Sequence, residues 1–101
     1  MKNLTLVIHA GAQQALADSL RALEQVQGFT LTPVEGHSGY SGADPFLSAR
    51  DKVVGYVPRV RVDVLLVDAD VNLVLAALLS QQSFQGQGIY WVSPVEQQGR
   101  L

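Results

Sequence analysis

The sequence predicts an α+β fold in which four antiparallel strands form one sheet and two helices cover one of its faces. Two observations predict it. Apolar residues recur at helical spacing in two segments and alternate or cluster as in strands in four others. Along the chain these segments follow the order strand, helix, strand, strand, helix, strand. Right-handed crossovers fold that order into the ferredoxin-like arrangement. With 101 residues, the chain is expected to form one domain over residues 1–101.

The first βα unit is predicted from residue 4 to residue 28. Residues 4–8 form a short β-rich run, and residues 13–26 carry apolar side chains three and four positions apart, which indicates a helix packed on a core. Gly28 is suited to end that helix because glycine readily adopts the left-handed conformation found after many helices.

The second strand and a long loop follow. Residues 29–34 read as a strand, and Pro33 places it at a sheet edge because proline donates no hydrogen bond to a ladder. From Glu35 to Arg50 glycine, proline and serine replace the periodic pattern. Loops of this length in small domains are usually functional or mobile, so we expect a mobile loop at about residues 36–50.

The second half of the chain repeats the strand–helix–strand order. Residues 53–66 alternate with a period of two over most of their length. Asp68 is expected to cap the helix that follows, whose apolar face includes residues 71–79. Residues 83–88 form a glycine-containing loop, and the last strand begins at Gly88.

Composition excludes several classes of function. Seven basic and nine acidic side chains give a net charge of −2, which argues against nucleic-acid binding. The chain has no cysteine, and its longest near-apolar stretch is too short to cross a bilayer. Its first residues read as a strand and not as a signal peptide, so we expect a cytoplasmic protein. No nucleophile–base pattern or metal-protease spacing appears, and we expect no enzymatic activity.

The predicted topology brings several polar and glycine residues to one end of the sheet. His9 ends the first strand, Gly36 and His37 follow the second, and residues 86–88 precede the fourth. We therefore expect any binding site to lie at this end, beside the long loop.

The sheet face turned away from the helices is expected to be covered by a second copy of the chain. Apolar residues occur on both faces of the first and last strands, for example Leu6 and Val7, whereas a half-solvated sheet shows cleaner alternation. Arg59 and Arg61 share one face of the third strand. These arginines are suited to contact a ligand or partner. We favour instead an ion pair, either exposed or between subunits, with an acid such as Asp63 of another chain.

The second half resembles the PII signalling proteins. Residues 55–71, Gly-Tyr-Val-Pro-Arg-Val-Arg-Val-Asp-Val-Leu-Leu-Val-Asp-Ala-Asp-Val, look like their strand-to-helix passage. Residues 86–91, Gly-Gln-Gly-Ile-Tyr-Trp, look like their nucleotide-binding B-loop, with Ile89 at the position of its lysine. Residues 1–4 and 34–39 are similar to the first strand and to the approach to the T-loop. The resemblance extends over almost the whole chain.

This resemblance implies a homotrimer of ferredoxin-like subunits that binds an effector, such as an adenine nucleotide, in clefts between copies. It also implies a flexible T-loop that contacts a protein partner. The chain looks closest to short, divergent PII-like proteins that often accompany heavy-metal efflux systems, so the implied partner is a membrane transporter or efflux system. The implied ligand-binding residues are Gly36, His37, Gly86, Gln87, Gly88 and Arg100.

Two alternatives remain open at this point. His9 and His37, with carboxylates of the loop region, are suited to hold a divalent metal such as zinc or copper, which predicts an accessory protein of metal tolerance. The two histidines are separated by two strand spacings, about 10 Å, so a shared metal requires loop folding or a neighbouring subunit. The other alternative is a structural trimer that has lost its effector.

Overall fold

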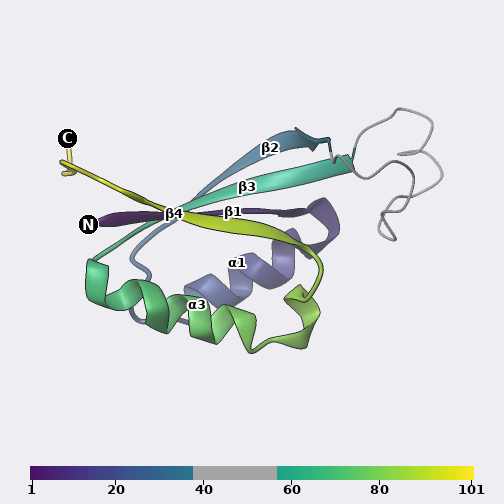
Figure 1. Cartoon of the computed structure of the whole chain (residues 1–101), viewed down its shortest axis with the longest axis horizontal. Coiled ribbons are helices and arrows are strands. Elements are labelled where there is room, and N and C mark those ends of the chain that lie inside the picture. Colours follow the sequence, from purple (N-terminus) through teal and green to yellow (C-terminus); the bar gives the residue numbers. More distant parts are fainter. Residues whose placement is uncertain (38–56) are drawn as a thin grey trace.

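The computed structural model describes residues 1–37 and 57–101. Within them the strands pair in the order β2-β3-β1-β4, and every neighbouring pair is antiparallel. Both helices lie on the same side of the sheet (Figure 1). This α+β architecture is the expected ferredoxin-like arrangement. The elements are β1 (Lys2–His9), α1 (Gln13–Arg21), β2 (Thr30–Gly36), β3 (Val57–Leu66), α3 (Val71–Leu79) and β4 (Gly88–Pro94).

The register of the two central strands sorts side chains between the two faces of the sheet. Leu4 lies opposite Val64, and Leu6 lies opposite Val62. All four side chains are buried on the helix side, each at most 8% exposed. Because side chains alternate along a strand, the intervening residues of β1 and β3 face away from the helices. We call that side the open face.

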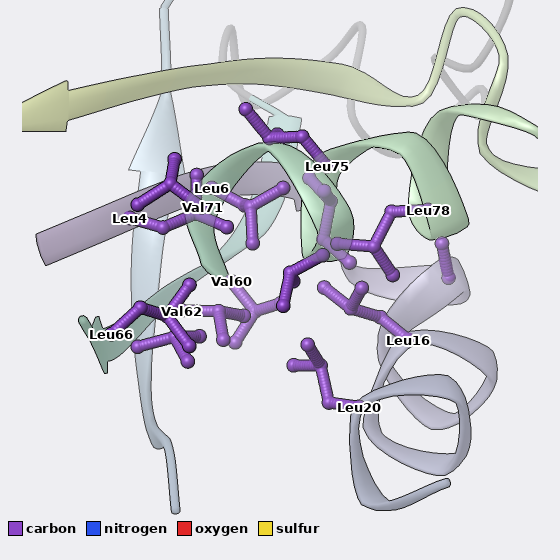
Figure 2. Packing of buried hydrophobic residues seen from close by; sticks show 14 residues of the cluster. Leu4, Leu6, Leu16, Leu20, Val60, Val62, Leu66, Val71, Leu75 and Leu78 are labelled. Carbon is purple, nitrogen blue, oxygen red and sulfur yellow. The ribbon is translucent and has the colours of Figure 1, made fainter. Parts of the chain in front are cut away.

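The core lies between the sheet and the two helices. Leu16 and Leu20 come from α1, Leu75 and Leu78 come from α3, and all four point toward the buried valines and leucines of β1 and β3 (Figure 2). Burying a side chain of this size contributes about 1.5–3 kcal/mol. The alternating apolar residues of β3 and the apolar residues at helical spacing in α3 therefore stabilise the same core, one from the sheet and one from the helices.

The first helix ends earlier than expected. It stops at Arg21, and Ala22 is its C-cap, whereas the leucine spacing predicted a helix to about residue 26. The chain then continues in turns, with Val26 N–H bonded to the Leu23 carbonyl three residues back. Those turns keep Leu23 and Val26 packed against the core, so the apolar spacing persists without the helix. Gly28 has no left-handed conformation, since Gly86 is the one positive-φ residue among those described.

Asp68 does not cap the second helix, contrary to expectation. Residues 68–70 form a 3₁₀ turn, and α3 begins after Asp70 without a side-chain cap. The Asp68 carboxylate instead lies 2.9 Å from the N-terminal ammonium group and 3.7 Å from Lys2 Nζ. The hydrogen bond from the ammonium group holds the pKa of Asp68 below its usual range. These ion pairs connect the start of β1 to the 3₁₀ turn before α3.

The observed bounds of β2 and β3 differ slightly from those predicted. Pro33 lies in β2, which is an edge strand as expected; β2 itself runs two residues further than predicted, to Gly36. The strand predicted from residue 53 is observed from Val57 to Leu66. Residues 53–56 and the loop residues 38–50 lie outside the described part of the chain. No helix within residues 1–37 and 57–101 has the length and apolar character needed to cross a membrane.

Replacing Leu20 by alanine is expected to lower the free energy of unfolding by about 2–5 kcal/mol, because the leucine is fully buried and the change leaves a cavity. Leu73→Ala on α3 is the matched control, since Leu73 is 57% exposed; it should change stability by no more than about 0.5 kcal/mol. Urea unfolding followed by circular dichroism, at one protein concentration, measures both. Equal losses in the two variants would contradict the assignment of the core.

Candidate functional site

Three strands bring the expected site residues to one end of the sheet. His9 at the end of β1 lies opposite Arg59 of β3, and Gly36 at the end of β2 lies opposite Val57. The loop before β4 lies at the same end, where the Gln87 backbone carbonyl accepts a 2.8 Å hydrogen bond from the His9 N–H. Val57, the first described residue of β3, lies at this end too, opposite Gly36. We call it the loop end.

The expected ligand-binding groups fall into two sets at the loop end. Gly36 and His37 belong to the β2 edge, whereas residues 86–88 belong to the β4 edge. Three strand spacings, about 14 Å, separate the two edges. One small ion therefore cannot touch both sets in one copy, while an extended ligand or a second copy can connect them.

The glycine loop has a structural role of its own. Gly86 has φ of 72°, a conformation that disfavours residues with a β-carbon. A β-carbon at Gly88 would collide with the Val7 carbonyl oxygen and with the Ile8 backbone of the neighbouring strand. Both glycines are thus required for β4 to join β1, whether or not a ligand contacts them.

His9 and His37 make different local contacts. The Nδ1 atom of His9 accepts a hydrogen bond of 3.1 Å from the Gly11 N–H and so caps the 3₁₀ turn at residues 10–12. His37 Nε2 lies 3.4 Å from Glu35 Oε2, and both side chains are about two-thirds exposed. Surface pairs of this kind contribute little to stability. Within the described ranges, no three His, Cys, Asp or Glu side chains gather so as to hold a metal ion.

Arg59 is a site residue for which the sequence offered ligand contact only as the less favoured alternative. It lies between His9 and Val34 in the strand register. Its side chain runs across Gly36, in the space that a β-carbon there would fill. The alternation of β3 placed Arg59 on the open face, but nothing in that pattern shows that its side chain reaches the base of the loop. A cation therefore lies at the loop end, on the β2 side.

Arg100 lies far from the other expected residues of its own chain. β4 runs from Gly88 at the loop end to Pro94 opposite Lys2, a length of about 20 Å. The chain continues outward from there, so its C-terminus lies at the end of the sheet opposite the loop end (Figure 1). Any contact of Arg100 with an effector at the loop end therefore belongs to another copy.

The open face carries a polar network in its centre. Arg61 Nε lies 3.0 Å from Asp63 Oδ2 of the same chain. The expected ion pair with Asp63 is therefore present, but it lies within one chain. Thr5 Oγ1 and Asn3 Nδ2 also donate to Asp63 Oδ1, at 2.9 and 3.2 Å. The Arg61 guanidinium lies 5.6 Å from the centre of the Trp91 ring, within cation–π range.

Comparison with known proteins gives the family. The sequence profile described as "Protein of unknown function (DUF3240)" matches residues 1–101. The chain belongs to the DUF3240 family. It resembles a solved DUF3240 family protein from Shewanella baltica OS155, with a TM-score of 0.77 and 23% identity over 99% of this chain and 94% of that one.

Curated relatives connect this DUF3240 chain to the PII proteins, as the sequence motifs indicated. A "Nitrogen regulatory protein P-II" from Cereibacter sphaeroides is 29% identical over the whole chain and 91% of its own length. A protein of the same name from Rhizobium meliloti (strain 1021) is 32% identical over 79% of this chain and 75% of its own length. The DUF3240 chain is therefore a relative of the PII proteins along most of its length.

Gly88→Ala is expected to destabilise the DUF3240 fold by roughly 1–3 kcal/mol or more, because the added β-carbon meets backbone that cannot easily move. Gly28→Ala is the control. Nothing lies within 4 Å of a β-carbon there, and the change should be neutral or stabilise by about 0.4–1 kcal/mol. Thermal unfolding compares the two; a tolerant Gly88 would mean that its role is not structural.

Stability is also expected to depend on Asp63 at acid pH. Burial raises the pKa of this carboxyl, but the hydrogen bonds from Arg61, Thr5 and Asn3 outweigh it and hold the pKa below its usual range. The contribution of Asp63 to the free energy of unfolding is therefore fully present above the pKa of a carboxyl in the unfolded chain, about 4. It is lost as the pH falls through the pKa of Asp63 in the folded state. Between neutral and strongly acid pH, the free energy of unfolding should fall less steeply for Asp63→Asn than for wild type. Parallel curves would rule this contribution out.

Proposed function

We propose that this chain is a PII-like regulatory binding protein and not an enzyme. In this proposal a cytoplasmic homotrimer senses a small effector in clefts between copies. It signals to a protein partner, such as a membrane transporter or efflux system, through a mobile loop at about residues 36–50. The observation that carries the proposal is the convergence at the loop end of the glycine loop, His37 and Arg59. The names of the curated relatives, nitrogen regulatory proteins, support the regulatory class.

The proposed effector is anionic and extended. Arg59 supplies positive charge beside Gly36. The Gln87 N–H is bonded to the Phe84 carbonyl oxygen, so the donors proposed for phosphate oxygens are the backbone N–H groups of Gly86 and Gly88. The separation of about 14 Å between the two edge strands suits a molecule with two recognised ends. An adenine nucleotide meets these conditions, although Ile89 provides no charge where the PII proteins have lysine.

The cleft is proposed to be shared between copies. Arg100 is excluded from the loop end of its own chain by the length of β4, so its proposed role requires a neighbour. The open face supports association, since Leu65, Ile89 and Trp91 leave 39–64% of their surface exposed there. Contiguous apolar surface on a small protein marks an interaction site. Each cleft then takes Arg59 from one copy and Arg100 from the next.

In calorimetric titration with adenine nucleotides, cyclic dinucleotides and bicarbonate, one effector class is expected to bind the wild type. Arg59→Ala should weaken that binding by about 10- to 100-fold, the loss typical of a charge-assisted hydrogen bond. Arg21→Ala, which removes an arginine from α1, is the control and should leave the affinity unchanged. If none of these ligands binds the wild type, the proposal that the protein senses such an effector is contradicted.

A mixing experiment tests the sharing of the cleft. Arg59→Ala and Arg100→Ala should each bind poorly alone. After the two are unfolded together and refolded, about one cleft in four should hold both arginines, if copies combine at random in a closed ring. Recovery of about a quarter of the wild-type sites is expected. No recovery, with both variants folded and trimeric, would place Arg100 outside the cleft.

A further inference from the structure

A small apolar cavity lies between the two helices and β4. Its volume is about 60 Å³. Leu16 of α1 and Leu78 of α3 line its buried part, each 2% exposed, and they lie side by side in Figure 2. Leu79 and Tyr90 line its outer part, with 56% and 46% of their surface exposed. The cavity therefore reaches the surface where the end of α3 meets β4.

The size of the cavity limits what can fill it. Protein interiors are packed so densely that they contain few voids larger than a water molecule. A water molecule needs about 10–15 Å³ of such space, and a cavity of roughly 150 Å³ accepts benzene. This cavity lies between those sizes and has aliphatic and aromatic walls, so it is suited to an aliphatic group of a few carbons, such as the end of a leucine side chain.

The segment that surrounds the cavity has no charged side chain. Residues 71–95 contain no acidic, basic or histidine residue, and they include α3 and β4. Leu73, on the same helix as Leu79, is 57% exposed. A helix that is apolar around its whole circumference is normally covered by another element. The exposed side of α3 and the cavity beside it therefore form one uncharged apolar surface.

The group that fills the cavity belongs to a larger molecule. Free metabolites of three or four carbons carry polar groups, which these walls would leave without hydrogen bonds. An aliphatic group attached to a peptide or a lipid, in contrast, can enter the cavity while the polar part of the molecule stays outside.

Charge and backbone geometry favour a peptide over a lipid. Helices that lie on membranes carry Lys or Arg beside their apolar face, whereas α3 has neither and follows Asp68 and Asp70. The Gln87 carbonyl and the Val95 N–H bond to β1. Strand alternation then turns the N–H and carbonyl of Tyr90 away from β1, toward the sheet edge that β4 forms. Extended peptides pair with main-chain groups placed in this way.

We propose that this cavity is a docking site for a partner protein, which inserts one aliphatic side chain of an uncharged, extended segment between α3 and β4. The inference rests on the proposed function for the existence of a protein partner, and it adds a contact with that partner outside the loop at about residues 36–50. Gly88 also lines the cavity, so the docked segment borders the glycine loop of the proposed effector cleft.

The test uses the full chain and two peptides with blocked ends. The first consists of serine, threonine and glutamine with one central leucine, and the second has alanine in place of that leucine. NMR titration follows the methyl groups of Leu78 and the N–H of Tyr90. Leu79→Phe closes the mouth of the cavity. Leu73→Phe is the matched control, because Leu73 is equally exposed on the same helix but does not line the cavity.

The leucine peptide should bind wild type and Leu73→Phe with equal affinity. The alanine peptide should bind at least about tenfold more weakly, and Leu79→Phe should weaken binding of the leucine peptide by a similar factor, as expected for the loss of a buried anchor. Equal affinity of the two peptides, no binding of either, or an equal loss in Leu73→Phe overturns the proposal. If Leu79→Phe is unfolded, Leu79→Lys, which places a charge at the mouth, is judged by the same outcomes.

Other occupants of the cavity give different results. Phosphatidylcholine vesicles that bind the wild type but not Leu79→Phe would identify a lipid chain as the occupant. A lower molar mass for Leu79→Phe than for wild type would identify a second copy. Either result overturns the proposal.

The docking site and the proposed function fail in different ways. Binding of an effector from the calorimetric panel without binding of the leucine peptide removes the docking site alone. Binding of the leucine peptide at the cavity without binding of any effector leaves the docking site in place and removes effector sensing.

Discussion

The pairing of β1 with β3 is the constraint on which the rest of the structure depends. Its register places Leu4 and Leu6 opposite Val64 and Val62 on the helix side. A shift of one strand by one residue would move its apolar side chains from the helix side to the open face and expose part of the core. The same register places His9 opposite Arg59 and Thr5 opposite Asp63. One set of backbone hydrogen bonds thus determines the core, the loop end and the polar network together.

The two faces of this sheet carry separate parts of the proposed function. The helix side is an ordinary apolar core and explains why the chain folds. The open face holds the Arg61–Asp63 ion pair, Arg59, a tryptophan and exposed aliphatic side chains. The loop end lies where these surfaces end, so in the proposed trimer a neighbour would complete a cleft there. The proposal thus links association to effector binding without requiring a deep pocket within one chain.

Much of the fold followed from periodicity. The order of elements, the edge position of Pro33 and the burial of the alternating valines of β3 were all predictable, because each depends on neighbouring residues along the chain. The end of α1 and the role of Asp68 were not. At Asp68 a tertiary contact decides, because the carboxylate pairs with the N-terminal group. After Arg21 the chain leaves the helix although Leu23 still packs on the core.

The site was predictable in position but not in detail. Strand ends indicated that His9, His37 and the glycine loop share one end of the sheet. The alternation of residues along β3 shows which face a side chain is on, but not how far it extends. For this reason neither the path of Arg59 across Gly36 nor the pairing of Arg61 with Asp63 in the same chain was predicted. Arg100 lies far from the loop end because β4 leads away from it. The sequence resemblance that suggested Arg100 as a ligand-binding residue does not contain this distance.

Molar mass in solution tests the central claim most directly, because the proposed clefts exist only between copies. Sedimentation equilibrium of the wild-type chain from nanomolar to micromolar concentration is expected to give three times the chain mass of 10.9 kDa at the upper end. A single species of one chain mass throughout would contradict the account, because the open face would then be solvated and the loop end would lack its second wall.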